Sequence, residues 1–210
     1  MLSSMFDVEG FILVGGASSR MGTDKSQLLF GGQTAVELLA KELVAVTAKV
    51  SLVGSRNENL RSGFKIVTDV YQRWGALGGI HAALSATGTE WAIVVACDLP
   101  FISRELLWHL MGLARAQPPF DAVVPIQADG RPQPLCALYR REPCLEIAER
   151  LIGEGEHTPR ALLAAVNTRW VAFEELAGLP GADYFFFNVN TPADYEQAQQ
   201  ILLRNSDAAE

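Results

Sequence analysis

The chain has 210 residues, of which 49% are hydrophobic, and a formal net charge of −7 at neutral pH. This length suits one α/β domain, because a chain of this size buries roughly 70% of its unfolded surface. The acidic balance argues against a nucleic-acid partner on a broad basic surface, and no apolar run approaches the ~18 residues of a membrane span. An anionic substrate would therefore need local cations and a metal ion.

Residues 1–9 lack a basic segment followed by an apolar one, so no secretory signal is expected. The cysteines and histidines also lack metal-ligand spacing. Three unpaired thiols suit a reducing compartment, so we expect a cytoplasmic protein in which the histidines are structural or surface residues. These residues are Cys97, Cys136, Cys144, His81, His109 and His157.

A glycine-rich loop follows the first predicted strand. The apolar run 11–14 predicts a short buried strand, which breaks at Gly15-Gly16. Backbone N–H groups in such a loop form an anion-binding concavity, to which Arg20 and Lys25 add two cations. At the carboxyl end of a strand, this combination predicts a cradle for a polyphosphate. The alternative is an ordinary strand-to-helix turn rich in glycine and serine.

Neither of two commoner phosphate-binding motifs fits this loop. Lys25-Ser26 supplies the ending of a Walker A motif, but Ser19 and Asp24 occupy its glycine positions. The dinucleotide pattern G-x-G-x-x-G fails because Gly15 is followed by Gly16-Ala17.

A strand–helix–strand rhythm continues from the loop. Thr34 and Glu37 have the spacing of a capping box, which predicts a helix ending near Thr47. Strands are expected at 49–53 and 65–68. This order predicts a parallel sheet with right-handed crossovers.

Asp69 ends the third predicted strand on the ligand side of such a sheet. It either holds a ligand or caps a loop. A glycine-rich turn is expected at 74–80, followed by a helix to about Ala86.

Asp98 follows the apolar run 91–97, which predicts a central strand buried on both faces. Pro100 then stops strand pairing, so this carboxylate lies at the ligand edge of the sheet. Mg²⁺ takes hard oxygen ligands, typically one or two carboxylates plus substrate phosphates. Asp98 is therefore the candidate Mg²⁺ ligand, and a solvated or capping carboxylate is the alternative.

Asn188 and Asn190 are predicted at a strand end before the last helix, whose third residue is Asp194. They are either polar contacts of the site or caps of a helix and turn. The other elements are a helix after Ser103 to about 116, hairpin strands 121–125 and 133–139 around Asp129-Gly130, a helix 142–152, a helix opening at Thr158-Pro159, a strand 170–173, a loop 174–183 and a helix from Thr191-Pro192 to about 203. Residues 1–204 are expected to form one domain and 205–210 a frayed tail.

Four motifs resemble, in the same order, those of the molybdenum cofactor guanylyltransferases, which belong to the Rossmann-like nucleotidyltransferases. They are L-x-G-G-x-S-x-R-M-G-x-D-K at 13–25, C-D-L-P at 97–100, D-G-R-P-Q-P-L at 129–135 and N-x-N-T-P-x-D at 188–194. The resemblance implies a three-layer α/β/α fold with a mostly parallel central sheet and a small hairpin insertion. The Gly15-Gly16 pair separates this group from relatives with Ala-Gly, including the cytidylyltransferases.

The same resemblance implies roles for individual residues. The nucleotide would contact Leu13, Val14, Gly15, Gly16, Ser18, Lys25, Asp69, Gly79 and Asp98. The catalytic residues would be Lys25, Arg20 and Asp98, with Mg²⁺ on Asp98. The second substrate, a phosphorylated pterin, would face Arg131, Gln133, Asn188 and Asn190. For Arg131 and Gln133 the alternative is a turn with exposed polar side chains.

Three positions depart from the family pattern and bear on the ribose and base contacts. Ala76 stands where the family has proline, Gly78 is an additional glycine, and the asparagine of the second strand is replaced at Val53 or Gly54.

The implied reaction is transfer of GMP from GTP to the terminal phosphate of molybdopterin, with Mg²⁺ and release of pyrophosphate. The substrates would be these two small molecules, with no nucleic acid or membrane, and transient contact with molybdenum-insertion or molybdoenzyme-maturation proteins is compatible with that role. Alternatives are a molybdopterin cytidylyltransferase, a sugar-phosphate nucleotidyltransferase and a non-catalytic nucleotide-binding module. A nucleotide-dependent oxidoreductase lacks its dinucleotide fingerprint.

Overall fold

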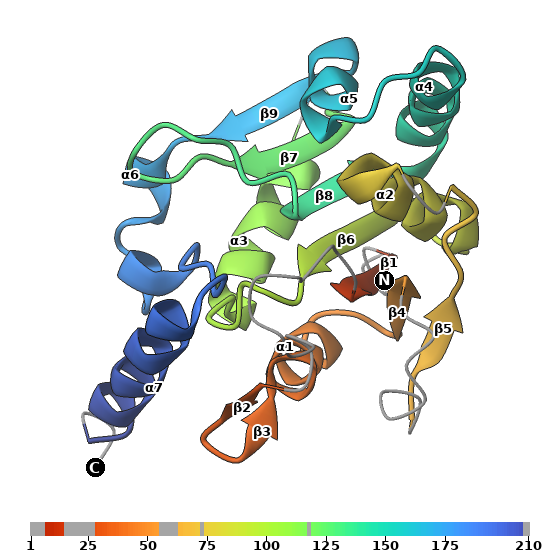
Figure 1. Ribbon diagram of the computed structural model, residues 1–210. Coiled ribbons are helices and arrows are strands. Elements are labelled where there is room, and N and C mark those ends of the chain that lie inside the picture. The colour runs from red at the N-terminus through yellow and green to blue at the C-terminus, as the bar shows by residue number, and fades with distance from the viewer. Residues whose placement is uncertain (1–6, 15–27, 55–62, 72–73, 117–118, 208–210) are drawn as a thin grey trace, which may run out of the picture.

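The computed structural model describes residues 7–14, 28–54, 63–71, 74–116 and 119–207. Within these ranges seven strands form one sheet (Figure 1). Their order across the sheet is β5 (Lys65–Val67), β4 (Val50–Gly54), β1 (Val8–Val14), β6 (Trp91–Ala96), β8 (Cys136–Arg140), β7 (Ala122–Pro125) and β9 (Thr168–Val171). The pairs among β5, β4, β1 and β6 are parallel, as is β7 with β9, whereas β8 is antiparallel to both β6 and β7. The predicted mostly parallel sheet is confirmed.

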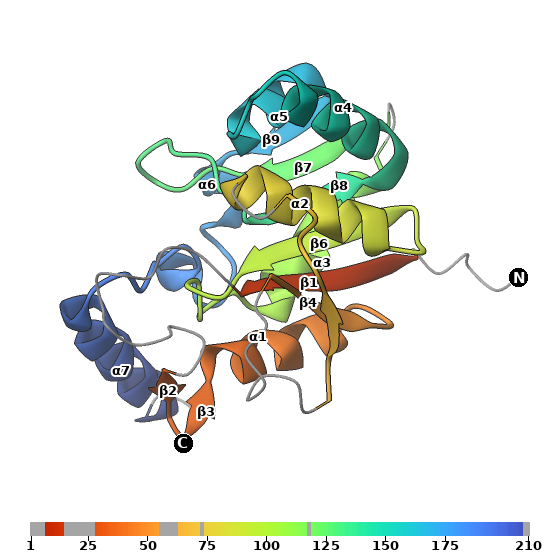
Figure 2. The ribbon, with the colours of Figure 1, turned by 45° about the vertical axis from the view of Figure 1, so that its right-hand side comes forward.

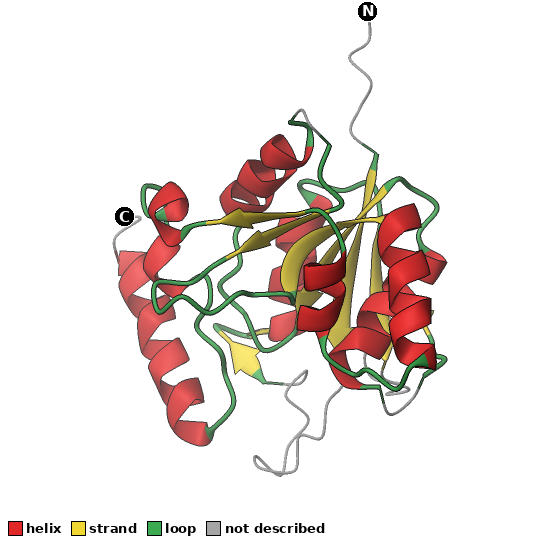
Figure 3. Cartoon of the chain, turned by 90° about the horizontal axis from the view of Figure 1, so that it is seen from above, coloured by secondary structure: helices red, strands yellow, loops and turns green. Residues whose placement is uncertain are grey.

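Helices cover both faces of this sheet (Figure 3). One face carries α1 (Ala35–Val44), α3 (Arg104–Ala114) and α6 (Phe173–Leu176), and the other carries α2 (Gly75–Ala86), α4 (Arg141–Gly153) and α5 (Pro159–Ala165). Strand β1 serves both cores, because Ile12 packs into the first and Leu13 into the second. Alternate residues of a strand point to opposite faces, so a continuous apolar run is what a doubly covered strand requires. The three-layer α/β/α prediction is confirmed.

A smaller apolar cluster lies outside the sheet, where α7 (Pro192–Asp207) packs beside β2 (Leu29–Phe30) and β3 (Gln33–Thr34) (Figures 1 and 2). We call this cluster the satellite core; its buried members are Phe30, Ala35, Val189 and Ala198. Helix α7 continues to Asp207, beyond its predicted end near Leu203.

Two predicted helix caps are present. The Thr34 hydroxyl accepts the Glu37 N–H at 3.2 Å, and the Glu37 carboxylate accepts the Thr34 N–H at 2.7 Å. Ser103 caps α3 through the N–H of Leu106 at 3.4 Å. Thr158 and Pro159 open α5 as predicted, but the Thr158 side chain makes no capping hydrogen bond, and the Thr158 N–H donates to the Glu156 carboxylate at 2.8 Å.

Two predicted irregular segments are helical instead. The glycine-rich turn at 74–80 is the first half of α2, which begins at Gly75. The loop at 174–183 contains α6, which takes Phe173 from the predicted strand, and a short 3₁₀ helix at Ala182–Tyr184. Such short helices depend on tertiary contacts rather than on propensity. Here Leu176 is buried and Glu175 accepts a hydrogen bond from Arg169 at 2.6 Å, and neither contact is encoded by local periodicity.

A bidentate ion pair links α1 and α3 on the first face of the sheet. Arg104, at the start of α3, donates from Nε at 2.9 Å and from a terminal nitrogen at 3.0 Å to the carboxylate of Glu42 on α1. Burial raises the pKa of Glu42, but the hydrogen bonds and charge of Arg104 outweigh it, so the net pKa lies below the ordinary value of 4.5. The ion pair therefore contributes fully above that pH and weakens as the pH falls through the lowered folded value.

Substituting glutamine for Glu42 should lower the free energy of unfolding by about 1–3 kcal/mol at pH 7, since hydrogen bonds to a charged group are the strong ones. Urea unfolding at pH 7 and at pH 3 measures the difference, which should shrink at the lower pH. The matched control is Glu90→Gln, because Glu90 makes a 2.9 Å pair with Arg140 while remaining 60% exposed. Such exposed pairs contribute little, so equal losses in the two variants would contradict this assignment.

Candidate functional site

The parallel strands β1, β4, β5 and β6 end at one edge of the sheet, at Val14, Gly54, Val67 and Ala96. In Figure 2 the arrowheads of β1 and β6 point toward the side on which α7 lies. Because β8 runs the other way, its first residue, Cys136, meets the same edge. The chain thus leaves β1, β4, β5 and β6 and enters β8 at this edge, and open α/β sheets bind ligands at such an edge.

The glycine-rich stretch of the sequence begins directly after β1. Residues 15–27 are not among those described, so the roles of Gly15, Gly16, Ser18, Arg20 and Lys25 remain predictions.

Leu13, Val14 and Gly79 are predicted nucleotide contacts, and the structure shows how each of them is packed. Leu13 and Val14 are buried in opposite cores, so only their backbone groups are available to a ligand. A Cβ on Gly79 would lie 2.7 Å from Cδ2 of Leu13, which is closer than real contacts allow. The absence of a side chain at Gly79 thus lets α2 approach the end of β1 closely.

Asp69 caps the turn that leads into α2. Its Oδ1 accepts the Tyr71 N–H at 2.9 Å, which is the loop-capping arrangement expected as the alternative. The additional glycine of the sequence, Gly78, has a role in this turn. A Cβ on Gly78 would lie 3.2 Å from Asp69 Oδ2 and 3.1 Å from the carbonyl oxygen of Tyr71. Gly78 therefore makes room for the Asp69 turn, and the predicted nucleotide contact of Asp69 stays a prediction.

Asp98 lies two residues beyond β6 and is half-buried. The preceding residue, Cys97, donates its N–H to the Leu13 carbonyl at 3.1 Å, which extends the pairing of β1 and β6 to the edge. The carbonyl oxygen of Asp98 accepts the Val189 N–H at 2.9 Å. The structure thus brings Asp98 and the asparagine pair together, although 90 positions separate Asp98 from Asn188 in the chain.

Asn188 and Asn190 lie in an irregular segment, so the predicted strand end is wrong. Hydrogen bonds to the Asp98 loop and among its own side chains hold this segment, in place of pairing with a neighbouring strand. Asn190 donates its side-chain amide to Asn188 Oδ1 at 2.7 Å. Asp194 accepts the N–H groups of Asn190 and Thr191 at 2.9 and 2.8 Å and so caps α7. Both asparagine residues are exposed, on either side of Val189, whose N–H contacts the Asp98 carbonyl oxygen.

The predicted hairpin between β7 and β8 is confirmed, with a turn in which Gly130 N–H donates to the Gln127 carbonyl at 2.8 Å. Arg131 donates from Nε to Asp129 at 2.6 Å and is 70% exposed in its side chain. The hydrogen bonds from Arg131 hold the pKa of Asp129 below its ordinary value. Gln133 is half-buried, and its N–H donates to the Pro125 carbonyl at 2.9 Å. The turn with exposed polar side chains is therefore present, and the substrate contacts of Arg131 and Gln133 stay predictions.

Histidine and cysteine side chains take structural positions. His81 is buried and lies 3.7 Å from Glu149, and the ring of His157 packs on Trp74 with centroids 4.1 Å apart. Burial raises the pKa of the Cys136 and Cys144 thiols to about 12, so neither is a thiolate at neutral pH.

The donor chemistry at Asp98 fits a hard divalent cation. In the part of the chain that the structure describes, no three His, Cys, Asp or Glu side chains lie together as a metal cluster. A site with one carboxylate matches Mg²⁺, which keeps waters and takes phosphate oxygens from the substrate.

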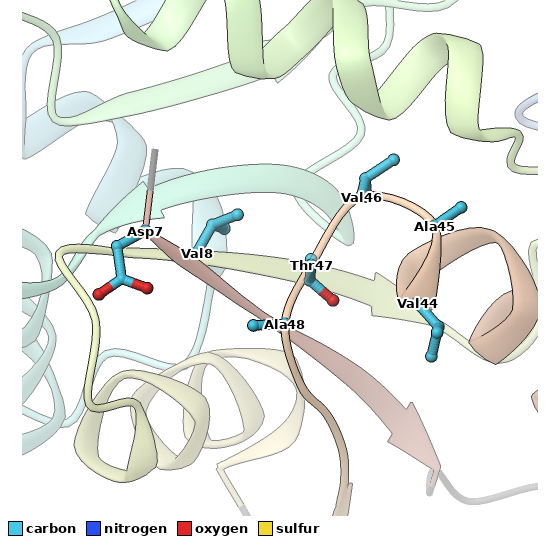
Figure 4. A pocket seen from close by; sticks show the side chains of 7 residues that line it. All are labelled: Asp7, Val8, Val44, Ala45, Val46, Thr47 and Ala48. Atoms are coloured by element: carbon cyan, nitrogen blue, oxygen red, sulfur yellow. The ribbon is translucent and has the colours of Figure 1, made fainter. Parts of the chain in front are cut away.

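A hollow of about 230 Å³ lies at the opposite edge of the sheet, between the start of β1 and the end of α1 (Figure 4). Its lining is mainly small and apolar, from Asp7-Val8 and residues 44–48. It is remote from the carboxyl ends of the strands. Over the described ranges, no helix has the length and apolar character needed to cross a membrane.

Sequence reasoning missed Tyr195, which follows the last motif directly. Its hydroxyl donates to the Leu29 carbonyl at 2.6 Å. An aromatic residue directly after the capping Asp194 was the only local signal, and it does not reveal a partner 166 positions away.

Comparison with known proteins places the chain in a family. Residues 10–170 match the model of the MobA-like NTP transferase domain. The chain is 35% identical over 203 residues to a probable molybdenum cofactor guanylyltransferase of Pelotomaculum thermopropionicum, covering 96% of each chain. It is 30% identical to the molybdenum cofactor guanylyltransferase of Desulfosudis oleivorans, covering 93% of this chain and 96% of that protein.

A solved structure agrees with these relatives. Molybdopterin-guanine dinucleotide biosynthesis protein A from Archaeoglobus fulgidus superposes with a TM-score of 0.79 at 28% identity, covering 93% of this chain and 99% of that one. The matches span nearly the whole chain, including the sheet edge that carries Asp98. The chain therefore belongs to the MobA-like nucleotidyltransferases and, within them, to the molybdenum cofactor guanylyltransferase family.

Proposed function

We propose that the protein transfers GMP from GTP to the terminal phosphate of molybdopterin. An oxygen of that phosphate attacks the α-phosphorus of GTP, the bond between the α-phosphorus and its bridging oxygen breaks, and pyrophosphate leaves. The observation that carries the proposal is the hydrogen bond from the Val189 N–H to the Asp98 carbonyl oxygen, which places the asparagine segment against the Asp98 loop, next to the carboxyl ends of β1 and β6. The relatives named above support the identity of the two substrates.

The residues of the chain act mainly by positioning and by offsetting charge, as is usual in phosphoryl-type transfers. The backbone of the glycine-rich loop would hold the phosphates of GTP, and Lys25 and Arg20 would balance the charge of the leaving pyrophosphate. Asn188 and Asn190, with Arg131 and Gln133 on the hairpin, would contact the pterin substrate. Asp69 and Gly79 would border the nucleotide.

The nucleotidyltransferase family suggests a divalent metal, and we assign it as Mg²⁺ held by Asp98. Bound there, the ion would draw charge from the phosphate oxygens during the transfer. We also place the protein in the cytoplasm as one domain over residues 1–204, which its unpaired cysteines and continuous family match support. Proteins that insert molybdenum or mature molybdoenzymes are the partners compatible with this role.

Nucleotide preference tests the proposal. The melting temperature should rise most with GTP, less with CTP, ATP or UTP, and more in the presence of Mg²⁺, because a ligand of the native state stabilises it by mass action. The matching reaction assay measures pyrophosphate release from GTP in the presence of molybdopterin. A larger shift with CTP would contradict the guanylyl assignment, and no shift with any nucleotide would contradict nucleotide transfer.

A further inference from the structure

The satellite core joins segments that flank the candidate site. Phe30 comes from β2, which follows the glycine-rich loop in the chain, and Ala198 comes from α7. Phe101, which follows Asp98 in its loop, and Phe187, which precedes Asn188, pack against this core with their rings 6.0 Å apart. The satellite core therefore includes residues from both the Asp98 loop and the asparagine segment.

Val189 connects this core to the site. Its side chain is 2% exposed within the satellite core, whereas its N–H donates to the carbonyl oxygen of Asp98. The residues on either side are Asn188 and Asn190, both exposed. Because Val189 is anchored at its side chain and at its N–H, the backbone of the asparagine segment is held against the backbone of the Asp98 loop.

Tyr195 links α7 to β2 by a hydrogen bond and a ring contact. Its hydroxyl donates to the carbonyl oxygen of Leu29 at 2.6 Å, and its ring packs edge-on against Phe30 with centroids 5.3 Å apart. Tyr195 lies directly after Asp194, whose carboxylate accepts the N–H groups of Asn190 and Thr191. A displacement of Tyr195 would thus shift the start of α7 together with the asparagine segment.

We propose that Tyr195 is a positioning residue. Through the satellite core, it fixes the position of the asparagine segment relative to Asp98. Removing a residue that orients a metal ligand commonly lowers metal affinity or activity by about 10–100-fold. The inference rests on the proposed function for its effect on Mg²⁺ and GTP. Its structural part, the link from Tyr195 to the Val189 N–H, can be measured without any substrate.

The test compares Tyr195→Phe, which removes only the hydroxyl, with Tyr195→Leu, which also removes the ring. The control is Thr168→Val, which removes a 2.7 Å hydroxyl-to-carbonyl hydrogen bond to Leu163 at the start of β9, away from the site. Two quantities are measured in each protein: the hydrogen-exchange rate of the Val189 amide without ligand, and the Mg²⁺ concentration that gives half of the GTP-dependent rise in melting temperature.

We expect the Mg²⁺ requirement to rise about 2–10-fold in Tyr195→Phe, the range of one lost hydrogen bond, and further in Tyr195→Leu. Exchange at Val189 should accelerate in the same order, with both quantities unchanged in Thr168→Val. An unchanged Val189 amide in Tyr195→Leu, or an equal change in the control, would overturn the inference. Lack of any GTP–Mg²⁺ stabilisation in the unmodified protein would instead count against the proposed function, while the exchange data would still decide the link.

Discussion

Asp98→Asn should reduce GMP transfer by about 10²–10³-fold, the loss typical of removing one group that stabilises developing charge. Asparagine has nearly the same shape as aspartate and keeps an oxygen at the end of the β6 loop. It lacks the negative charge with which a carboxylate binds a divalent cation. The backbone bond from Val189 to residue 98 is untouched, so the loop should keep its position. Initial rates of pyrophosphate release at several Mg²⁺ concentrations measure the loss.

The control for this variant is Asp183→Asn, the same substitution at an exposed carboxylate in the 3₁₀ helix. Both variants should unfold at similar denaturant concentrations, since neither removes buried apolar surface. The Mg²⁺-dependent part of the GTP stabilisation should disappear in Asp98→Asn alone. Turnover close to that of the unmodified protein at every Mg²⁺ concentration, including limiting ones, would show that Asp98 is not the metal ligand.

Lys25→Gln should lower kcat/KM for GTP by a similar factor, about 10²–10³-fold. In the sequence, this cation lies at the end of the glycine-rich stretch that follows β1. Glutamine is only one atom shorter than lysine and can donate a hydrogen bond, but it cannot balance the charge of the leaving pyrophosphate. Lys25→Arg should therefore retain more activity than Lys25→Gln.

Initial rates over a range of GTP concentrations separate the two kinetic constants. Lys65→Gln serves as the control, because Lys65 is exposed and begins β5, the strand at one side of the sheet. If Lys25→Gln and Lys65→Gln behaved alike, the phosphate role of Lys25 would be wrong.

The features that the sequence predicted correctly are those that a short stretch encodes by itself. Apolar residues without interruption specify β6, and Asp98 directly after them lies at the expected edge. Thr34 and Glu37 form the capping box because their spacing alone determines it. The hairpin turn at Gly130 likewise follows from adjacent residues.

The features that were missed depend on contacts between distant segments. The asparagine segment was predicted as a strand end, yet its anchors are Asp98 and the satellite core, which no period reveals. The glycine-rich stretch before Ile80 was predicted as a turn, because glycine usually breaks helices. In the structure the cost of helical glycine is offset by close packing on Leu13 and on the Asp69 turn.

The reversal of β8 divides the chain into two parts that can change separately. The wholly parallel strands β5, β4, β1 and β6 carry the loops assigned to the nucleotide, and β8 introduces the hairpin assigned to the pterin. A hairpin accepts insertions at its tip without moving the strands beside it. Residues 127–131 can thus lengthen or change charge to suit another acceptor, while the nucleotide half keeps its geometry. One fold can in this way combine a constant donor site with acceptors of different size.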